Sequence, residues 1–515
     1  MKKRMICMLI IAVSTMMLFG CGKEKSAVDG DIVTIKYWQT LNPQLTTVAK
    51  NIGETPYAKK MQEILGVNIE FIHPNSDEQF NLMLASGDLP DIVEHAWLFY
   101  GGGPEKAMSD KYIINLNEIF ENNAPNLKKY LNENPEIDTM IKTDNGNYYA
   151  FPFIRGDEKL LVSTGPIVRK DWLSELSLSV PETMEDWYNM LTLFKEKKGA
   201  NMPLTFMPYD NAFRSGLFTG AYGVAKDFYI GDDGKVKFGA IEPGYKEFII
   251  EMRKWYKEGL LDNNFMSIDA KAVDSSMLNG TAGATFGALG GGIGKYLGEK
   301  TNEDYDLIGT PYPVLKKGDI PMLSTRQNPY PGLGAAISSK SKNADIAAKV
   351  LDFAYSEEGH LLNNFGIENE SYTLQNGKPV YTELITKNPD GISMAGMMAQ
   401  YLRANYMGAF VQDVGYIEQY ASLPQQQAAL DMWTNTTAEK HKLPAITHSE
   451  EDSAELATIM SDIYTYENEG FLNFIIGATD LSKLDEYVSK MNEMGIQRAI
   501  DIYQRSLDKY NTRGQ

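Results

Sequence analysis

Aromatic side chains stand next to amide and carboxylate side chains at two places directly after predicted strands. Trp38, Gln39 and Asn42 follow the first strand, and Glu94 and Trp97 follow the third. An aromatic ring can pack on an apolar face of a small molecule, while amides and carboxylates hydrogen-bond its hydroxyl groups. We therefore predict that these five residues bind a ligand, with Trp38 and Trp97 as the stacking rings. The alternative is that either ring packs in the core at the rim of the site.

Further candidates of the same kind lie in loops later in the chain. Asp210 and Phe213 belong to a segment that mixes polar and aromatic residues, although Asp210 is equally suited to start an ordinary helix. Phe286 stands in a glycine-rich region, where the backbone can approach a ligand closely. The predicted set of ligand-binding residues is completed by Tyr222, Arg326, Tyr330 and Tyr372.

The sequence contains no arrangement typical of catalysis, nucleotide binding or a metal site. The glycine-rich segment 287–294 has neither the phosphate-loop spacing nor the GxGxxG spacing, and no GxSxG or HExxH motif occurs. The segment 144–147 (DNGN) carries residues that can bind calcium. It lacks the other ligands of a calcium loop and its closing Glu, so a hairpin turn is the better interpretation. We expect no cofactor and no metal ion.

The charge balance excludes a further class of partner. The chain has 68 acidic and 49 basic residues and a formal net charge of −19. Proteins that bind nucleic acids do so through clustered Lys and Arg, so we expect no nucleic-acid partner. The length of 515 residues predicts two or three domains, and 43% hydrophobic residues are typical of a globular protein with a sizeable core.

Cys21 is expected to be the first residue of the mature chain. Basic residues at positions 2–4 precede an apolar run that is too short to span a membrane and that ends in Leu18-Phe19-Gly20-Cys21. This junction resembles the lipobox of bacterial lipoproteins, in which the cysteine becomes residue one and carries the lipid. The alternative is an ordinary signal peptide with a chance cysteine. We expect a signal peptide at 1–20, lipid on Cys21 and a flexible polar tether over 21–30.

Strands and helices alternate around the candidate residues. Strands are predicted at 32–38, 67–72 and 91–93, and helices at 57–65 and 76–87 lie between them. This order is typical of a parallel sheet flanked by helices, which places the chain in the α/β class. Later segments with helical spacing and capping residues are 183–198, 245–257, 345–355 and 484–494.

Several segments resemble those of one family. LASGDLPDIV at 84–93 resembles the "SGDxPDI" segment of extracellular solute-binding proteins that serve sugar ABC importers, the maltose-binding-like group. The chain departs from long lipoprotein members of Gram-positive bacteria at Asn369 and Ser371, where Gly and His are usual. The resemblance covers nearly the whole mature chain. The other segments, in the same order as in the family, are 147–153, 168–173, 329–339, 347–359, 366–372 and 474–510.

The resemblance implies a two-lobe fold of the periplasmic-binding-protein type (type II), with two or three segments crossing between the lobes and a ligand cleft between them. The first lobe would comprise residues 31–155 and 315–368, and the second 156–314 and 369–515. The carboxyl ends of parallel strands would face the cleft, as in other open α/β sheets.

The resemblance also implies a function without chemistry. A lipid-anchored receptor on the outer face of a Gram-positive cell membrane would bind a solute, most often an oligosaccharide, and deliver it as a monomer to the permease subunits of an ABC importer. Two alternatives remain open from the sequence. One is a secreted carbohydrate-active hydrolase or lyase, which needs two carboxyl groups about 5–10 Å apart across a cleft. The other is a peptide-binding or surface-sensing lipoprotein on the same fold.

Overall fold

The computed structural model describes residues 32–207, 212–213, 216–403 and 407–513. The signal peptide expected at 1–20, the tether at 21–30 with Cys21, and Asp210 lie outside these residues. None of the helices within the described ranges combines the length and the apolar character needed to cross a bilayer.

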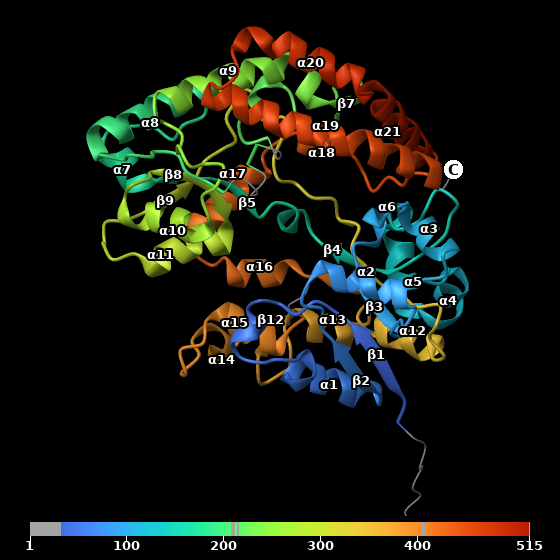
Figure 1. The fold of residues 1–515 in the computed structure, drawn as a ribbon. Coiled ribbons are helices and arrows are strands. Elements are labelled where there is room, and N and C mark those ends of the chain that lie inside the picture. The colour runs from blue at the N-terminus through green and yellow to red at the C-terminus, as the bar shows by residue number, and fades with distance from the viewer. Residues whose placement is uncertain (1–31, 208–211, 214–215, 404–406, 514–515) are drawn as a thin grey trace, which may run out of the picture.

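The first lobe is built on a six-stranded sheet with the order β13-β4-β10-β3-β1-β2 (Figure 1). β1 pairs in parallel with both β2 and β3, and Tyr37 lies between Phe71 and Ile92. β10 is antiparallel to β3 and β4, while β13 is parallel to β4. All strands but β10 therefore end at the same edge. The strands are β1 (Thr34–Trp38), β2 (Asn68–Ile72), β3 (Ile92–His95), β4 (Phe151–Arg155), β10 (Gly334–Ile337) and β13 (Phe410–Gln412).

Local sequence explains the helices that cover this sheet. α1 (Pro56–Leu65) begins after Thr55, whose side chain accepts a hydrogen bond from the Ala58 N–H, and it ends at Gly66 in the left-handed conformation. The other helices of this lobe are α2 (Asp77–Ser86), α3 (Gly103–Ser109), α4 (Asn117–Asn123), α5 (Pro125–Glu133), α6 (Pro135–Met140), α12 (Ala344–Phe353) and α13 (Glu357–Asn364).

The second lobe has a smaller sheet and more helices. β5 (Thr164–Arg169) lies between β8 (Ala284–Ala288) and β9 (Leu307–Gly309) and is antiparallel to both. A separate hairpin is formed by β6 (Phe228–Ile230) and β7 (Val236–Phe238). The helices are α7 (Lys170–Glu175), α8 (Met184–Lys198), α9 (Pro243–Lys257), α10 (Ala270–Asn279), α11 (Lys295–Glu299), α17 (Pro424–Thr434), α18 (Ala438–His441), α19 (Glu450–Ile476), α20 (Leu484–Glu493) and α21 (Ile496–Asn511).

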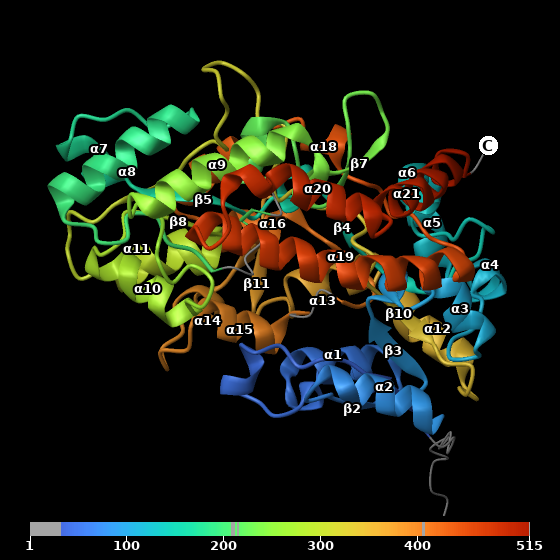
Figure 2. The ribbon, with the colours of Figure 1, turned by 45° about the horizontal axis from the view of Figure 1, so that its top comes forward.

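A third group of elements lies where the two lobes meet. The hairpin β11 (Tyr372–Gln375) and β12 (Lys378–Tyr381) is followed by α14 (Glu383–Thr386) and α15 (Met394–Tyr401). After β13, α16 (Val414–Tyr420) runs between the lobes (Figure 1). On the opposite side, α19 extends along α9 and reaches α3 of the first lobe (Figure 2).

Separate hydrophobic cores support the two lobes. Ile35, Trp97 and Ile337 belong to the core of the first lobe, and Trp187 and Trp255 to that of the second. The mixed α/β class is confirmed.

The expected lobe limits, 31–155 with 315–368 and 156–314 with 369–515, remain a prediction. Because β13 extends the first sheet, we propose that 369–412 is better assigned to the first lobe.

An ion pair ties the end of the chain to the first lobe. The segment 143–147 forms a tight turn, and the residues that flank it, Lys142 and Tyr148, form an antiparallel β-bridge. Its Asp144 carboxylate accepts hydrogen bonds from Arg513 Nε at 2.8 Å and Nη2 at 2.5 Å. Arg513 also donates to the Ala445 carbonyl and the Thr447 hydroxyl, so one guanidinium fastens the last helix to both segments.

Candidate functional site

The carboxyl edge of the large sheet places polar groups near the second lobe. Asn42 follows β1, Arg155 ends β4 and Gln412 ends β13. The Arg155 side chain donates from Nε to Gln327 Oε1 at 2.9 Å and from Nη1 to Gln412 Oε1 at 3.0 Å. Ligands of open α/β sheets bind outside this edge. The hollows lined by these two glutamines are therefore candidates for the binding site.

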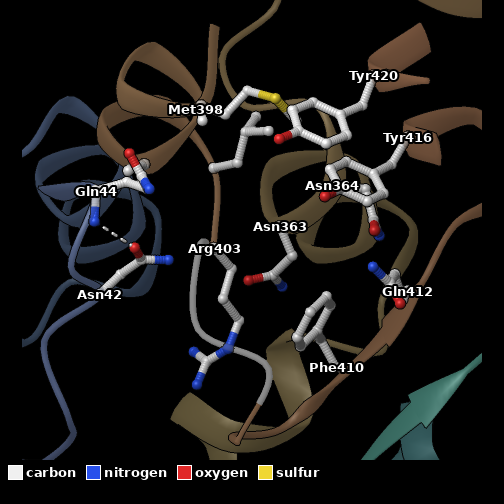
Figure 3. A pocket seen from close by; sticks show the side chains of 13 residues that line it. Asn42, Gln44, Asn363, Asn364, Met398, Arg403, Phe410, Gln412, Tyr416 and Tyr420 are labelled. Carbon is white, nitrogen blue, oxygen red and sulfur yellow. Dashed lines mark hydrogen bonds between the residues drawn. The ribbon is translucent and has the colours of Figure 1, made fainter. Parts of the chain in front are cut away.

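One hollow, which we name the tyrosine cavity, has a volume of about 220 Å³ and lies beside Gln412 (Figure 3). Asn42 and Gln44 form one wall, and Tyr416 and Tyr420 lie across from them (Figure 3). The lining thus combines rings with amides. Its other members are Asn363, Asn364, Ala395, Met398, Ala399, Leu402, Arg403, Phe410 and Gln412.

The two tyrosines come from one face of α16. They are four residues apart, and their rings are parallel within 8° with centroids 5.8 Å apart. Asp413 caps the helix by accepting from the Gly415 N–H at 2.7 Å. Tyr420 also touches the second lobe, because a Cβ built on Gly290 would lie 2.5 Å from its ring. The ring wall is therefore shared between the lobes.

Two neighbouring asparagines hold this wall in place. The Asn364 side chain accepts from the Asp413 N–H and donates to the Val411 carbonyl, both at 2.9 Å. Asn363 accepts from the Tyr57 hydroxyl at 2.8 Å. These bonds link α13, β13 and α16, so the two asparagines fix the cavity.

A buried ion pair lies under the cavity. Arg403 Nη2 contacts Glu94 Oε1, and the two side chains are 5% and 1% exposed. The Tyr37 hydroxyl donates to the same carboxylate oxygen at 2.6 Å. Burial raises the pKa of Glu94, and the Arg403 guanidinium opposes that rise. The ion pair joins β3 to the segment that follows α15.

A second hollow of about 600 Å³ is lined by Gln327, the other hydrogen-bond partner of Arg155. Phe99 and Tyr100 line it from the first lobe, and His448 and Tyr464 from the second. Phe99 is 71% exposed, which is unusual for a phenylalanine. Each of the two hollows thus contains one hydrogen-bond partner of Arg155, and the second hollow is lined by residues of both lobes.

The buried side chain of His448 should make the free energy of unfolding depend on pH. Burial lowers its pKa to about 4, while its ring bonds Ser506 at 2.8 Å. The unfolded chain takes up this proton near pH 6.5, and the folded chain does not do so until near pH 4. We therefore expect His448 to cost about 2 kcal/mol of stability as the pH falls from about 7 to 5. Urea unfolding should show a shallower pH dependence for His448→Asn than for wild type; equal slopes would contradict this assignment.

The comparisons with known proteins decide the family. The model of the bacterial extracellular solute-binding protein family matches residues 39–360. This chain belongs to that family.

Relatives of this solute-binding protein cover almost all of its length. It is 23% identical to the fructooligosaccharide ABC transporter substrate-binding protein FusA of Streptococcus pneumoniae over 97% of each chain. It is 23% identical to the lipoprotein LipO of Bacillus subtilis over 96% of this chain and 94% of LipO. The solved structure of the alginate-binding protein AlgQ2 has a TM-score of 0.71 at 26% identity, covering 93% of this chain and 99% of AlgQ2. The predicted two-lobe fold and the resemblance are confirmed.

Among the described residues, one of the twelve predicted ligand residues lines the tyrosine cavity. Asn42 lines it, and Glu94 lies behind Arg403, 3% exposed. Arg326 lines another hollow and pairs with Glu158. Tyr330 borders the second hollow, yet it is 1% exposed and bonds Tyr149.

Several of the predicted ligand residues are buried in this structure, and their role in ligand binding stays a prediction. Trp97 is completely buried and its Nε1 donates to the Val93 carbonyl at 3.0 Å, so its ring has no face for stacking. Trp38 is partly exposed but borders a different hollow, beside Leu82 on α2. Tyr222 is half-buried against Phe248. The remaining buried members of the predicted set are Gln39, Phe213, Phe286 and Tyr372.

The sequence interpretation missed the ring wall itself. Tyr416 and Tyr420 stand at helical spacing after a polar residue that can cap a helix, and this signal was available. Phe410 and Gln412 gave none, because β13 has only three residues, and Arg403 gave none, because it lies outside any helix or strand. Among the described residues, no group of three or more His, Cys, Asp or Glu is arranged to hold a metal ion.

Proposed function

We propose that this protein is a lipid-anchored receptor that binds an oligosaccharide and delivers it to an ABC importer, without chemical conversion. The observation that carries the proposal is the tyrosine cavity, in which parallel rings face amide side chains at the junction of the lobes. Rings suit the C–H faces of a sugar, and amides suit its hydroxyl groups. The ligand class is supported by two similar proteins, FusA, which serves a fructooligosaccharide transporter, and the alginate-binding protein AlgQ2.

Closure of the lobes would report the bound state. α16 carries both tyrosines and packs against elements of both lobes. A ligand that contacts both lobes shifts the equilibrium toward a closed form by its extra contacts in that form. The closed form would then be the one that the permease subunits recognise.

The expected location is the outer face of the cell membrane, with the lipid on Cys21. The relation to the lipoprotein LipO supports this proposal. The described chain starts at the amino end of β1, at the side of the first lobe away from the second (Figure 1). A tether at this point would leave the junction between the lobes free for ligand.

The cavity does not favour a hydrolase or lyase. Two carboxyl groups are needed on either side of a glycosidic bond, and no Asp or Glu lines the tyrosine cavity in the described part of the chain. The Glu94 carboxylate, which contacts the lining residue Arg403, is engaged by Arg403 and Tyr37. We therefore propose that the protein is not an enzyme.

A thermal-shift screen with an oligosaccharide library tests the function. A ligand present at about 100 times its Kd should stabilise the protein by about 2.7 kcal/mol and raise its Tm accordingly. The same samples are then analysed for cleavage products. Stabilisation with no product supports the receptor. Multiple turnover would establish an enzyme, and stabilisation by peptides alone would establish the peptide-binding alternative.

A further inference from the structure

The charges around the tyrosine cavity determine which glycans it can accept. Arg403 is the only charged residue among the described residues that line it. The other polar lining groups are neutral amides and tyrosine hydroxyls. Arg403 is therefore the one group among these lining residues that could neutralise the charge of a ligand carboxylate.

Arg403 is already neutralised by a carboxylate of the protein. Glu94 contacts its guanidinium directly, and both side chains are almost completely buried. The Tyr37 hydroxyl, on the neighbouring strand β1, donates a hydrogen bond that holds Glu94 in place. A second carboxylate entering the cavity would lose its hydration next to a pair whose net charge is zero, and the desolvation cost would not be recovered.

The hydroxyl and ether oxygens of a sugar suit the lining of the cavity better than a carboxylate does. In the described part of the chain, Arg403 Nε is buried and has no hydrogen-bond partner. A ligand hydroxyl or ether oxygen that reached this N–H would satisfy it and leave the Glu94 contact in place. The formal net charge of −19 acts in the same direction, because it repels anionic ligands at long range.

Resting on the oligosaccharide function proposed above, we propose that the tyrosine cavity selects neutral glycans over glycans that carry uronic acids. Glu94 is the positioning residue for this selectivity, because it cancels the charge of Arg403. The inference separates two classes of ligand that the relatives' names leave open, since FusA is named for a fructooligosaccharide and AlgQ2 for alginate.

Matched ligand pairs test the selectivity on the unmodified protein. Each neutral oligosaccharide that binds is compared by calorimetry with its counterpart in which one C6 hydroxymethyl group is oxidised to a carboxylate. We expect the oxidised counterpart to bind at least 10-fold more weakly. Equal or tighter binding of the oxidised counterpart, or binding of uronic-acid glycans alone, would overturn the inference and leave the proposed function standing. Absence of binding by every glycan would overturn both.

Glu94→Gln tests the role of the positioning residue. The amide still accepts the Tyr37 hydrogen bond but leaves the charge of Arg403 uncancelled. We expect the preference for the neutral member of each pair to shrink at least 10-fold or to reverse. Low ionic strength should enlarge this change, because salt screens the charge of Arg403 less. A circular dichroism spectrum like that of wild type shows that the variant is folded. An unchanged preference in the folded variant would reject the role of Glu94, and the wild-type comparison decides the selectivity if the variant does not fold.

Discussion

Arg403→Met is expected to destabilise the protein by about 3–5 kcal/mol, because it leaves the Glu94 carboxylate buried without its counter-charge. Glu94 is 3% exposed, and among the described residues it then keeps only the hydrogen bond from Tyr37. A loss of this size is a large part of the stability of an ordinary domain. Urea unfolding at neutral pH measures it through the midpoint at constant m-value.

The pH dependence of this variant identifies the cause. Without Arg403, burial raises the pKa of Glu94 above that of the unfolded chain, so the folded state holds the proton more tightly. Stability should therefore be highest below about pH 4 as far as this group is concerned, and fall as the pH rises through the folded pKa. Glu94→Gln combined with Arg403→Met should recover much of the lost stability at neutral pH. If the single and double variants are equally unstable at every pH, the loss comes from packing and not from charge.

The sequence predicted most of the elements that carry the first sheet. The strand expected at 67–72 is found at Asn68–Ile72, and the helix expected at 76–87 at Asp77–Ser86. The local sequence of these segments was enough to predict them. Apolar residues alternate in the strand, where the structure shows alternating burial, and Gly87, which adopts the left-handed conformation, follows the helix.

The site was harder to predict because its parts meet through long-range contacts. Arg403 and Glu94 are 309 residues apart in the chain, and no periodic pattern relates them. At the end of β3, the backbone turns into a 3₁₀ helix over Trp97–Phe99, which directs the indole of Trp97 into the core and leaves Phe99 71% exposed. The pattern predicted an aromatic loop here, but a shift of two residues decides which ring reaches solvent.

Tyr420→Ala is expected to weaken oligosaccharide binding about 30-fold, or about 2 kcal/mol, because it removes one ring of the parallel pair. The ring lies between Tyr416 and Gly290 and contacts both lobes. Its loss should also reduce the extra contacts that favour the closed form. Calorimetry with an oligosaccharide from the thermal-shift screen measures the change in Kd.

Two matched variants separate stacking from other effects. Tyr420→Phe keeps the ring and removes only the hydroxyl, so it should retain most of the affinity. Trp38→Ala removes a larger aromatic side chain that borders a different hollow beside α2, so the affinity should stay within about 2-fold of wild type. If Trp38→Ala weakens binding and Tyr420→Ala does not, the ligand contacts the loop after β1 as the sequence predicted, and the tyrosine cavity is not the binding site. The opposite result places the sugar rings against α16, where a single short helix couples ligand contact to the relative position of the lobes.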